Sequence, residues 1–152
     1  DMDLHDEVLM PNPIVVIAPV SDPLTKSPQI SLNDLAGHRF ILREPGSGTR
    51  MAADQHFRKM RFHPDVRLEL GSNEAVKESV AGGLGIGVVS RHALHGLDKE
   101  NGVRVVDVEG FPLPSAWHMV HHAGQKLSPV ALAFRQHVLA QNQAAKRRAP
   151  AR

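Results

Sequence analysis

The sequence predicts an α/β fold with a largely parallel sheet, because short apolar runs typical of buried strands alternate with amphipathic helical patterns along the chain. Two further observations support this prediction. Small polar residues follow several of the apolar runs and precede the helical patterns, as N-cap residues do. No internal repeat interrupts the alternation, so a solenoid or array architecture is not indicated.

The N-terminal part of the chain is predicted to form strands and one short helix. Val8–Met10 is a short apolar run, and Ile14–Val20 is apolar on both faces, as a strand buried on both sides would be. Ser31–Asp34 matches a capping box and predicts a helix of one to two turns that ends at Gly37. Arg39–Arg43 has the pattern of a further short buried strand.

Two strands and two helices are predicted in the middle of the chain. Residues 66–70 place Val, Leu and Leu on one face, which is typical of a half-buried strand, and residues 86–89 form another apolar run. The first helix is expected to start near residue 47 or 49, and the second after residue 73. Their apolar faces are Ala53, Phe57 and Met60 in the first helix, and Val76 and Val80 in the second.

The C-terminal part is predicted to contain a short helix over 91–94, strands over 103–108 and 117–122, and a longer helix. Ser128 is the expected N-cap of that helix, because Pro129 at the first helical position loses no hydrogen bond. Its apolar stripe is Val130, Phe134 and Val138. Residues 146–152 have no apolar face to bury and are expected to be a disordered basic tail.

Composition narrows the class of protein. The 152 residues allow one ordinary domain or two small lobes, and 18 Lys and Arg against 16 Asp and Glu leave a net charge of +2, too small to indicate nucleic-acid binding. Without cysteine there is no disulfide, thiol nucleophile or cysteine-ligated metal. No apolar run approaches the ~18 residues of a membrane span. The acidic N-terminus does not resemble a signal peptide, so a soluble cytoplasmic protein without a membrane partner is expected.

Two strand-to-helix turns are candidates for anion binding. The segment Arg43–Arg50 places small residues with free N–H groups at a helix start, where a carboxylate, sulfate or phosphate is favoured, and Arg50 can add charge. The segment Leu70–Glu74 repeats this arrangement, so both helix starts can face one crevice beyond the carboxyl ends of the strands. An N-cap without any ligand is the alternative explanation of each turn.

Other motifs do not indicate a cofactor, a metal or catalysis. Gly83–Gly87 follows a helix and precedes a strand, so it is interpreted as a helix stop and a close backbone approach, not a dinucleotide fingerprint. His118 and His122 share a strand face but lie about 13 Å apart. His92 and His95 have no carboxylate at ligand spacing. No local nucleophile with a base is found, so we expect no enzyme, although a site assembled from distant residues stays open.

Taken in order, these segments resemble the effector-binding domain of LysR-type transcriptional regulators, most closely the CbbR-type regulators of Calvin-cycle carbon-fixation operons. The resemblance covers nearly the whole chain. The segments that carry it are Val15–Pro19, Phe40–Arg50, Leu70–Lys77, Ala81–Ser90, Val106–Pro112 and Leu127–Pro129.

The resemblance implies a type 2 periplasmic-binding-protein-like domain of two α/β lobes with an incomplete first lobe. Residues 15–116 would form the second lobe, and residues 1–14 with 117–145 part of the first. It further implies a homo-oligomer, a dimer or a tetramer, that contacts DNA only through a helix-turn-helix region absent from this chain.

In the family, a small effector binds between the lobes. The resemblance implies a small anionic metabolite, such as a sugar phosphate, with no cofactor and no metal. The residues it assigns to effector binding are Ser47, Gly48, Thr49, Arg50, Ser72, Asn73 and Glu74. Two alternatives stay open: a solute-binding receptor of the same fold that serves a transporter, and a transferase or hydrolase that uses Ser47.

Overall fold

The computed structural model describes residues 3–94 and 102–148, which fall into two compact units. Unit 1 comprises residues 3–11 and 116–148, and unit 2 comprises residues 12–94 and 102–115. The sequence predicted a second lobe over residues 15–116. Its expected first residue lies three residues after the first residue of unit 2, and its expected last residue lies one residue after the last. His95, one member of the histidine pair considered above, lies outside the described residues.

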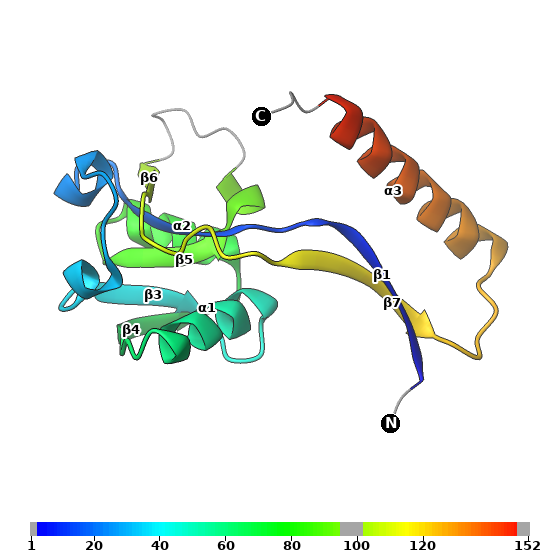
Figure 1. Ribbon diagram of the computed structural model, residues 1–152, viewed down its shortest axis with the longest axis horizontal. Coiled ribbons are helices and arrows are strands. Elements are labelled where there is room, and N and C mark those ends of the chain that lie inside the picture. Colours follow the sequence, from blue (N-terminus) through cyan, green and yellow to red (C-terminus); the bar gives the residue numbers. More distant parts are fainter. Residues whose placement is uncertain (1–2, 95–101, 149–152) are drawn as a thin grey trace. The chain divides into compact units, whose positions relative to one another are not determined.

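Unit 2 is built on a five-stranded sheet with the order β4-β3-β5-β2-β6 (Figure 1). Strand β3 is parallel to β4 and β5, whereas β2 is antiparallel to β5 and β6, so the expected largely parallel sheet is wrong for half of the strand pairs. The reason is connectivity. Helix α1 links β3 to β4 and α2 links β4 to β5, which keeps these three strands parallel, whereas β2 is consecutive in the chain with neither of its sheet neighbours. The strands are β2 (Ile14–Pro19), β3 (Arg39–Arg43), β4 (Asp65–Leu70), β5 (Ile86–Ser90) and β6 (Val103–Val106).

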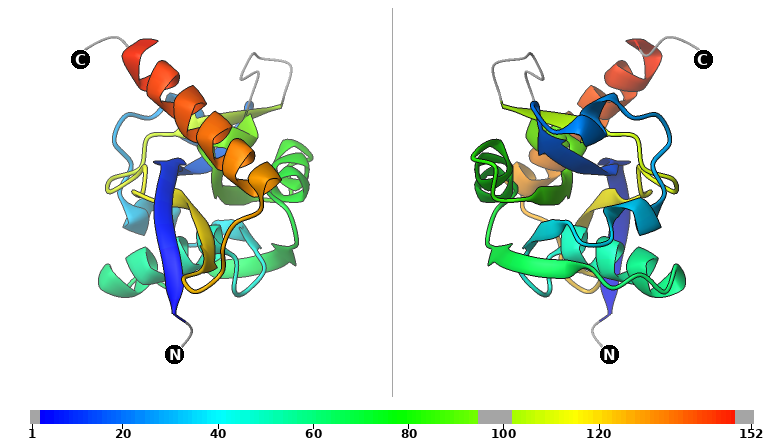
Figure 2. Two further views of the ribbon diagram at one scale, coloured as in Figure 1. Left: turned by 90° about the vertical axis from the view of Figure 1, so that its right-hand side faces the viewer. Right: turned by 90° about the vertical axis from the view of Figure 1, so that its left-hand side faces the viewer.

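Helices α1 (Gly48–Lys59) and α2 (Asn73–Ala81) cover opposite faces of this sheet (Figure 2). The α1 side buries Phe57 against Phe40, with ring centroids 5.8 Å apart, and the α2 side buries Val76 and Val80 against Ile41. Both predicted helices are confirmed, and their N-cap residues are Ser47 and Ser72. The two cores hold α1 and α2 against the sheet and thereby position the starts of both helices.

Met60 does not belong to the buried face of α1, contrary to the expected pattern. It is the C-cap residue of the helix and is 50% exposed. Phe62, which follows the helix end, packs against Phe40 in its place, with ring centroids 5.7 Å apart. The helix therefore ends at Lys59, one residue before the last position of the expected apolar face.

Strand β4 also departs from its expected pattern. A register shift against β3 leaves Arg67 without a partner, so Val66 pairs with Phe40 while Leu68 pairs with Ile41. A bulge of this kind reverses the side-chain alternation. Val66 consequently lies on the α1 side, and the predicted single face of Val, Leu and Leu is wrong for Val66.

The glycines between α2 and β5 act as interpreted from the sequence. Gly82 is the C-cap of α2. A Cβ atom at Gly85 would lie 2.3 Å from the carbonyl oxygen of Arg39, and one at Gly87 would lie 2.8 Å from Val80. The close backbone approach is confirmed, and it allows α2 to pack directly on β5.

The connections of unit 2 consist of short turns. The capping box at Ser31 is confirmed, and the predicted short helix is a single 3-10 turn, η2 (Leu32–Leu35), preceded by η1 (Pro23–Lys26). The expected helix over 91–94 is also a 3-10 turn, η3 (Arg91–Leu94). Strand β6 is shorter than the expected 103–108, because Val108 forms only an isolated bridge with Ile30.

Unit 1 consists of an antiparallel ribbon and one helix. The ribbon pairs β1 (Leu4–Pro11) with β7 (Ala116–His122), and α3 (Pro129–Arg148) lies beside β1. Arg135 on α3 forms an ion pair with Glu7 at 2.7 Å, while Val130 and Phe134 of the apolar stripe are exposed. The expected disordered tail began at residue 146, but α3 extends to residue 148. Residues 149–152 lie outside the described part of the chain.

His56 packs its ring between α1 and the turn at residues 109–111. Its ring centroid lies 5.1 Å from that of Phe111, and a Cβ atom at Gly110 would lie 2.7 Å from the ring. The Nε2 atom of His56 is buried without a hydrogen-bond partner among the described residues. Burial lowers the pKa of His56, and the charge of Lys59 lowers it further.

Adding a methyl group at Gly87 should destabilise the fold. We expect Gly87→Ala to lower the free energy of unfolding by about 1–3 kcal/mol, because the new Cβ overlaps Val76 and Val80 in a packed core. Urea denaturation measures this change. Gly71→Ala is the matched control, because a Cβ at Gly71 meets no atom within 4 Å. Equal stability of the two variants would contradict the packing described for α2.

His56 should make the stability of the protein depend on pH. Since its folded-state pKa lies below the ordinary value of 6.5, the unfolded chain binds the proton more readily. The contribution of neutral His56 to the free energy of unfolding is fully present above pH 6.5. It is lost as the pH falls toward the folded-state pKa. We expect the free energy of unfolding to decrease more between pH 7 and pH 5 in the wild type than in His56→Leu. Parallel pH profiles from chemical denaturation would exclude this role.

Candidate functional site

The two predicted anion-binding turns lie at the carboxyl ends of neighbouring parallel strands. Helix α1 follows β3 and α2 follows β4, and the two helices cover opposite faces of the sheet. Because the chain passes from β3 to β4 and then back to β5 on the other side of β3, the strand order reverses between β3 and β5. In open α/β sheets, ligands bind in the crevice at such a switch point.

Main-chain contacts hold the two turns side by side. Arg43 at the end of β3 pairs with Leu70 at the end of β4, and the N–H of Glu44 donates to the carbonyl oxygen of Leu70 at 3.0 Å. The structure therefore brings together the segments 43–50 and 70–74 that the sequence singled out.

The start of α1 presents two unoccupied backbone donors. The hydroxyl of Ser47 accepts from the N–H of Arg50 at 3.1 Å, and the carbonyl of Ser47 accepts from Met51 at 2.9 Å. Within the described residues, the N–H groups of Gly48 and Thr49 have no hydrogen-bond partner. Thr49 is 7% exposed, so its side chain lies against the core while its N–H remains at the helix start.

The start of α2 repeats this arrangement. The hydroxyl of Ser72 accepts from the N–H of Ala75 at 3.0 Å, and its carbonyl accepts from Val76 at 3.2 Å. The N–H groups of Asn73 and Glu74 have no acceptor in the part of the chain that the structure describes. Two helix starts with open donors thus lie beyond the ends of two paired strands. An anion is favoured there by the helix dipoles.

Two nitrogens of the Arg50 guanidinium, Nε and Nη1, form hydrogen bonds within the protein. Its Nε donates to both carboxylate oxygens of Asp54 at 3.0 Å, and its Nη1 donates to Glu69 at 2.7 Å and to the carbonyl oxygen of Arg43 at 2.8 Å. Burial lowers the pKa of Arg50, but the hydrogen bonds to Glu69 and Asp54 outweigh that effect and hold the pKa above its ordinary value. Arg50 therefore ties α1 to the ends of β3 and β4, and its direct contact with an anion stays a prediction.

Two carboxylates lie near the turns. Glu44 forms a bidentate pair with Arg43, at 2.8 and 2.9 Å, which raises the pKa of Arg43 and lowers that of Glu44. The negative charge of Glu74 also favours the charged form of Arg43. Glu74 is exposed in the first turn of α2, where a carboxylate interacts favourably with the helix dipole.

Sequence patterns missed two polar residues, Ser90, which contacts the start of α2, and Asn12, which contacts Ser90. The backbone N–H of Ser90, at the end of β5, donates to the side-chain oxygen of Asn73 at 3.3 Å, and the hydroxyl of Ser90 donates to the side-chain oxygen of Asn12. Asn12 is 6% exposed and Ser90 is 2% exposed. The sequence offered one signal for Asn12, because this polar residue stands between two prolines and close before a buried strand.

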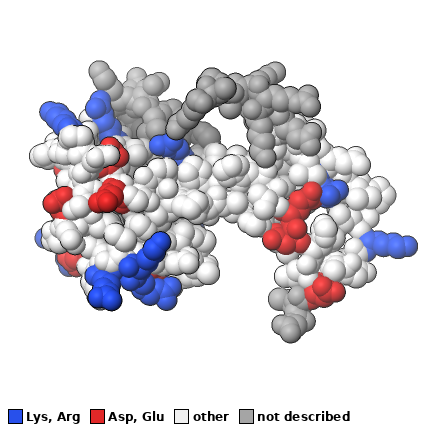
Figure 3. Space-filling view, viewed as in Figure 1, with Lys and Arg blue, Asp and Glu red and all other residues white. Residues whose placement is uncertain are grey.

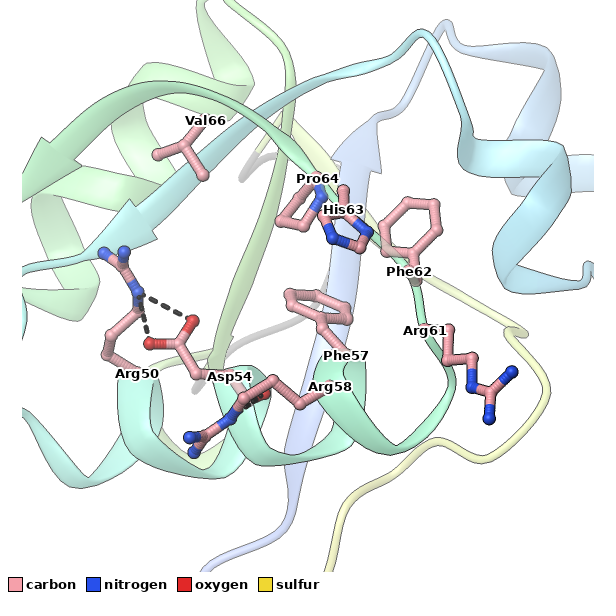
Figure 4. A pocket seen from close by; sticks show the side chains of 9 residues that line it. All are labelled: Arg50, Asp54, Phe57, Arg58, Arg61, Phe62, His63, Pro64 and Val66. Carbon is pink, nitrogen blue, oxygen red and sulfur yellow. Dashed lines mark hydrogen bonds and ion pairs between the residues drawn. The ribbon is translucent and has the colours of Figure 1, made fainter.

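A groove of 760 Å³ lies along α1 and β4. The residues that carry the open N–H groups of the helix starts do not line it. Its floor is apolar, and Figure 4 shows Phe57, Phe62 and Pro64 on one side of it and Arg50 with Asp54 on the other. Arg50 is the one predicted site residue in its lining. Lys and Arg side chains gather over α1 in Figure 3, where Arg58, Lys59 and Arg61 are exposed.

The histidines of the ribbon contact other side chains without forming a metal-binding group. The Nδ1 of His118 lies 2.7 Å from a carboxylate oxygen of Asp6, and the rings of His5 and His121 lie 4.9 Å apart. Over residues 3–94 and 102–148, no three His, Asp or Glu side chains are placed to hold one metal ion. None of the helices described is both long and apolar enough to cross a membrane.

Comparison with known proteins identifies the family. The family model described as the LysR substrate binding domain matches residues 1–143. A RuBisCO operon transcriptional regulator from Acidithiobacillus ferrooxidans is 43% identical over 139 residues, which are 91% of this chain and 45% of that protein. The HTH-type transcriptional activator CmpR from Synechocystis is 41% identical over 145 residues, 95% of this chain and 47% of the relative. The chain thus spans less than half the length of these two relatives.

Solved structures show the same fold. The regulatory domain of CcmR from Synechocystis, determined in complex with 2-PG, superposes with a TM-score of 0.87 at 37% identity over 94% of this chain and 69% of that chain. The effector-binding domain of QuiR with shikimate is 20% identical, with a TM-score of 0.80, over 93% of this chain and 66% of that chain, which shows the fold alone.

The fold class expected from the resemblance is confirmed as a type 2 periplasmic-binding-protein-like α/β fold. Because the family model covers almost the entire sequence and the regulators named above are more than 40% identical to it, this chain belongs to the LysR family of transcriptional regulators and corresponds to its substrate-binding domain.

Proposed function

We propose that this chain senses a small anionic metabolite for a cytoplasmic, homo-oligomeric regulator of carbon-fixation genes and has no catalytic activity. The observation that carries the proposal is the pair of helix starts at the carboxyl ends of β3 and β4, with four backbone N–H groups open to a ligand. Units 1 and 2 would then correspond to parts of the two lobes that the resemblance implies.

The chemistry of the helix starts fits an anion. The donors of Gly48 and Thr49 belong to α1, and those of Asn73 and Glu74 belong to α2. Main-chain N–H groups at a helix start donate charge-assisted hydrogen bonds to phosphate or carboxylate oxygens. The related CcmR domain was determined with 2-PG, and two relatives regulate RuBisCO operons or activate transcription, so a phosphorylated or carboxylated metabolite is the ligand class that we propose.

Arg50 would act as a positioning residue in this site. It connects the first turn of α1 to the carbonyl of Arg43 on β3 and to Glu69 on β4, so it fixes the N–H groups of Gly48 and Thr49 relative to the strands. A bound metabolite would change transcription only through different affinities for two arrangements of the complete regulator.

The two alternative functions receive less support. A transporter receptor is not favoured, because the family and the relatives above are transcriptional regulators. A hydrolase or transferase would need a base beside Ser47. In the described part of the chain, the hydroxyl of Ser47 accepts the N–H of Arg50, and no titratable side chain is bonded to it.

Removing one backbone donor tests the site without removing a side chain. Gly48 is the first residue of α1, where proline is tolerated, and Ser47 before it has the extended conformation that proline requires, with φ −69° and ψ 144°. We expect Gly48→Pro to keep the fold and to weaken the binding of 2-PG by about tenfold, as the loss of one charge-assisted hydrogen bond predicts. Isothermal titration calorimetry measures the affinity.

Gly48→Ala is the matched variant, because it keeps the N–H and its Cβ meets no atom within 4 Å. We expect it to retain most of the affinity. Binding of 2-PG, inorganic phosphate or glucose 6-phosphate that is equally strong in both variants would place the anion elsewhere. No binding of any of these anions to the wild-type chain would refute the proposed function.

Substitution of Arg50 should reduce stability as well as binding. Arg50→Ala removes hydrogen bonds to three groups from a side chain that is 13% exposed, so we expect a loss of about 2 kcal/mol in the free energy of unfolding. Arg58→Ala on the exposed face of α1 is the control, with an expected loss of less than about 0.5 kcal/mol. Denaturation in urea compares the two, and similar losses would argue against the positioning role.

A further inference from the structure

Asn12 is a buried polar residue for which neither the packing nor the site described above gives a role. It is the first residue of unit 2 and is only 6% exposed. Burying a side-chain amide is unfavourable unless its polar atoms form hydrogen bonds. The contacts of its oxygen and its nitrogen therefore indicate what the residue does.

Ser90 fixes the orientation of the Asn12 amide. The hydroxyl oxygen of Ser90 accepts the backbone N–H of His92 at 3.2 Å, and its single proton is donated to the side-chain oxygen of Asn12. The Oδ1 atom of Asn12 is thereby held toward Ser90. Its Nδ2 group, which carries two donors, points to the other side of the amide.

The Nδ2 group of Asn12 is open to a ligand. No hydrogen bond to it is formed within residues 3–94 and 102–148. In that same part of the chain, the fully buried side-chain nitrogen or oxygen atom that lacks a partner is Nε2 of His56. Nδ2 of Asn12 must therefore reach solvent, although the residue as a whole is nine-tenths buried.

A continuous line of polar contacts joins Asn12 to the start of α2. Ser90 donates its hydroxyl proton to Asn12 and its backbone N–H to the side-chain oxygen of Asn73, the first residue of that helix. The backbone N–H of Asn73 is one of the open donors of the candidate site. Asn12 is thus linked to the helix start through one residue, Ser90, at the carboxyl end of β5.

We propose that Asn12 is a ligand-contacting residue of the anion site, which donates from Nδ2 to an oxygen of the bound metabolite. This inference rests on the proposed function and names a residue that determines specificity within it. Because the helix starts bind the anionic group, the fixed donors of Asn12 select a ligand with a second acceptor oxygen, such as a hydroxyl or carboxylate, over inorganic phosphate.

Asn12→Asp tests this assignment with a side chain of the same size. The aspartate still accepts from the hydroxyl of Ser90, but its second oxygen replaces the two donors. We expect 2-PG to bind at least tenfold more weakly to this variant, as measured by calorimetry, while the affinity for inorganic phosphate falls less. A loss that persists when the salt concentration rises from about 0.05 M to about 0.5 M reports the missing donors, because salt screens charge repulsion.

Asn33→Asp is the matched control. Asn33 lies on η2 and is exposed. Its substitution by aspartate introduces the same change in charge, at a position far along the chain from the helix starts. We expect it to bind 2-PG like the wild type. A second measurement needs no variant at Asn12: in the ¹⁵N spectrum of the wild-type chain, the side-chain amide signal of Asn12 should shift on addition of 2-PG, and that of Asn33 should not.

The outcomes separate the two proposals. Binding of 2-PG that is equal in Asn12→Asp and Asn33→Asp overturns the assignment of Asn12 and leaves the proposed function intact. A loss that disappears at high salt, with no shift of the Asn12 amide signal, also overturns it. A wild-type chain that binds none of the anions refutes the proposed function and the assignment with it.

Discussion

The position of α2 on the sheet depends on the absence of a side chain at Gly87. A Cβ atom there would lie 2.8 Å from Val80 and 2.9 Å from Val76, so only glycine allows the helix to pack directly on β5. This contact fixes the height of α2 above the sheet. With α2 at that height, the side chain of Asn73 reaches the N–H of Ser90, and the first turn of the helix lies at the end of β5. The open donors of the candidate site follow from a packing constraint in the core.

Local patterns in the sequence predicted the elements and their starting points well. Ser47 and Ser72 are N-caps because their side chains precede amphipathic helices, and this arrangement needs only three or four neighbouring residues. The capping box at Ser31 is equally local. Such features are visible in a sequence because the atoms that interact are close along the chain. The family resemblance rested on the same segments and predicted the fold class correctly.

Features that depend on distant residues were not predictable in the same way. The antiparallel direction of β2 is set by its pairing with β5 and β6, not by its own apolar pattern. The bulge at Arg67 breaks an alternation that the sequence suggested was regular. Glu69, which binds the guanidinium of Arg50, lies nineteen residues away along the chain. The contact between Asn12 and Ser90 spans 78 residues, and no short sequence motif predicts it.

The two ends of unit 2 meet in a single hydrogen bond. The N–H of Asn12, its first residue, donates to the carbonyl oxygen of Ser115, its last residue, at 2.8 Å. The sheet of unit 2 and its two cores are formed entirely by residues between these two positions. Unit 2 therefore has the chain geometry of a module inserted into a host, since its ends are adjacent and its core is its own. Such a module can be exchanged between relatives, or joined end to end by a short linker, without rerouting any of its strands.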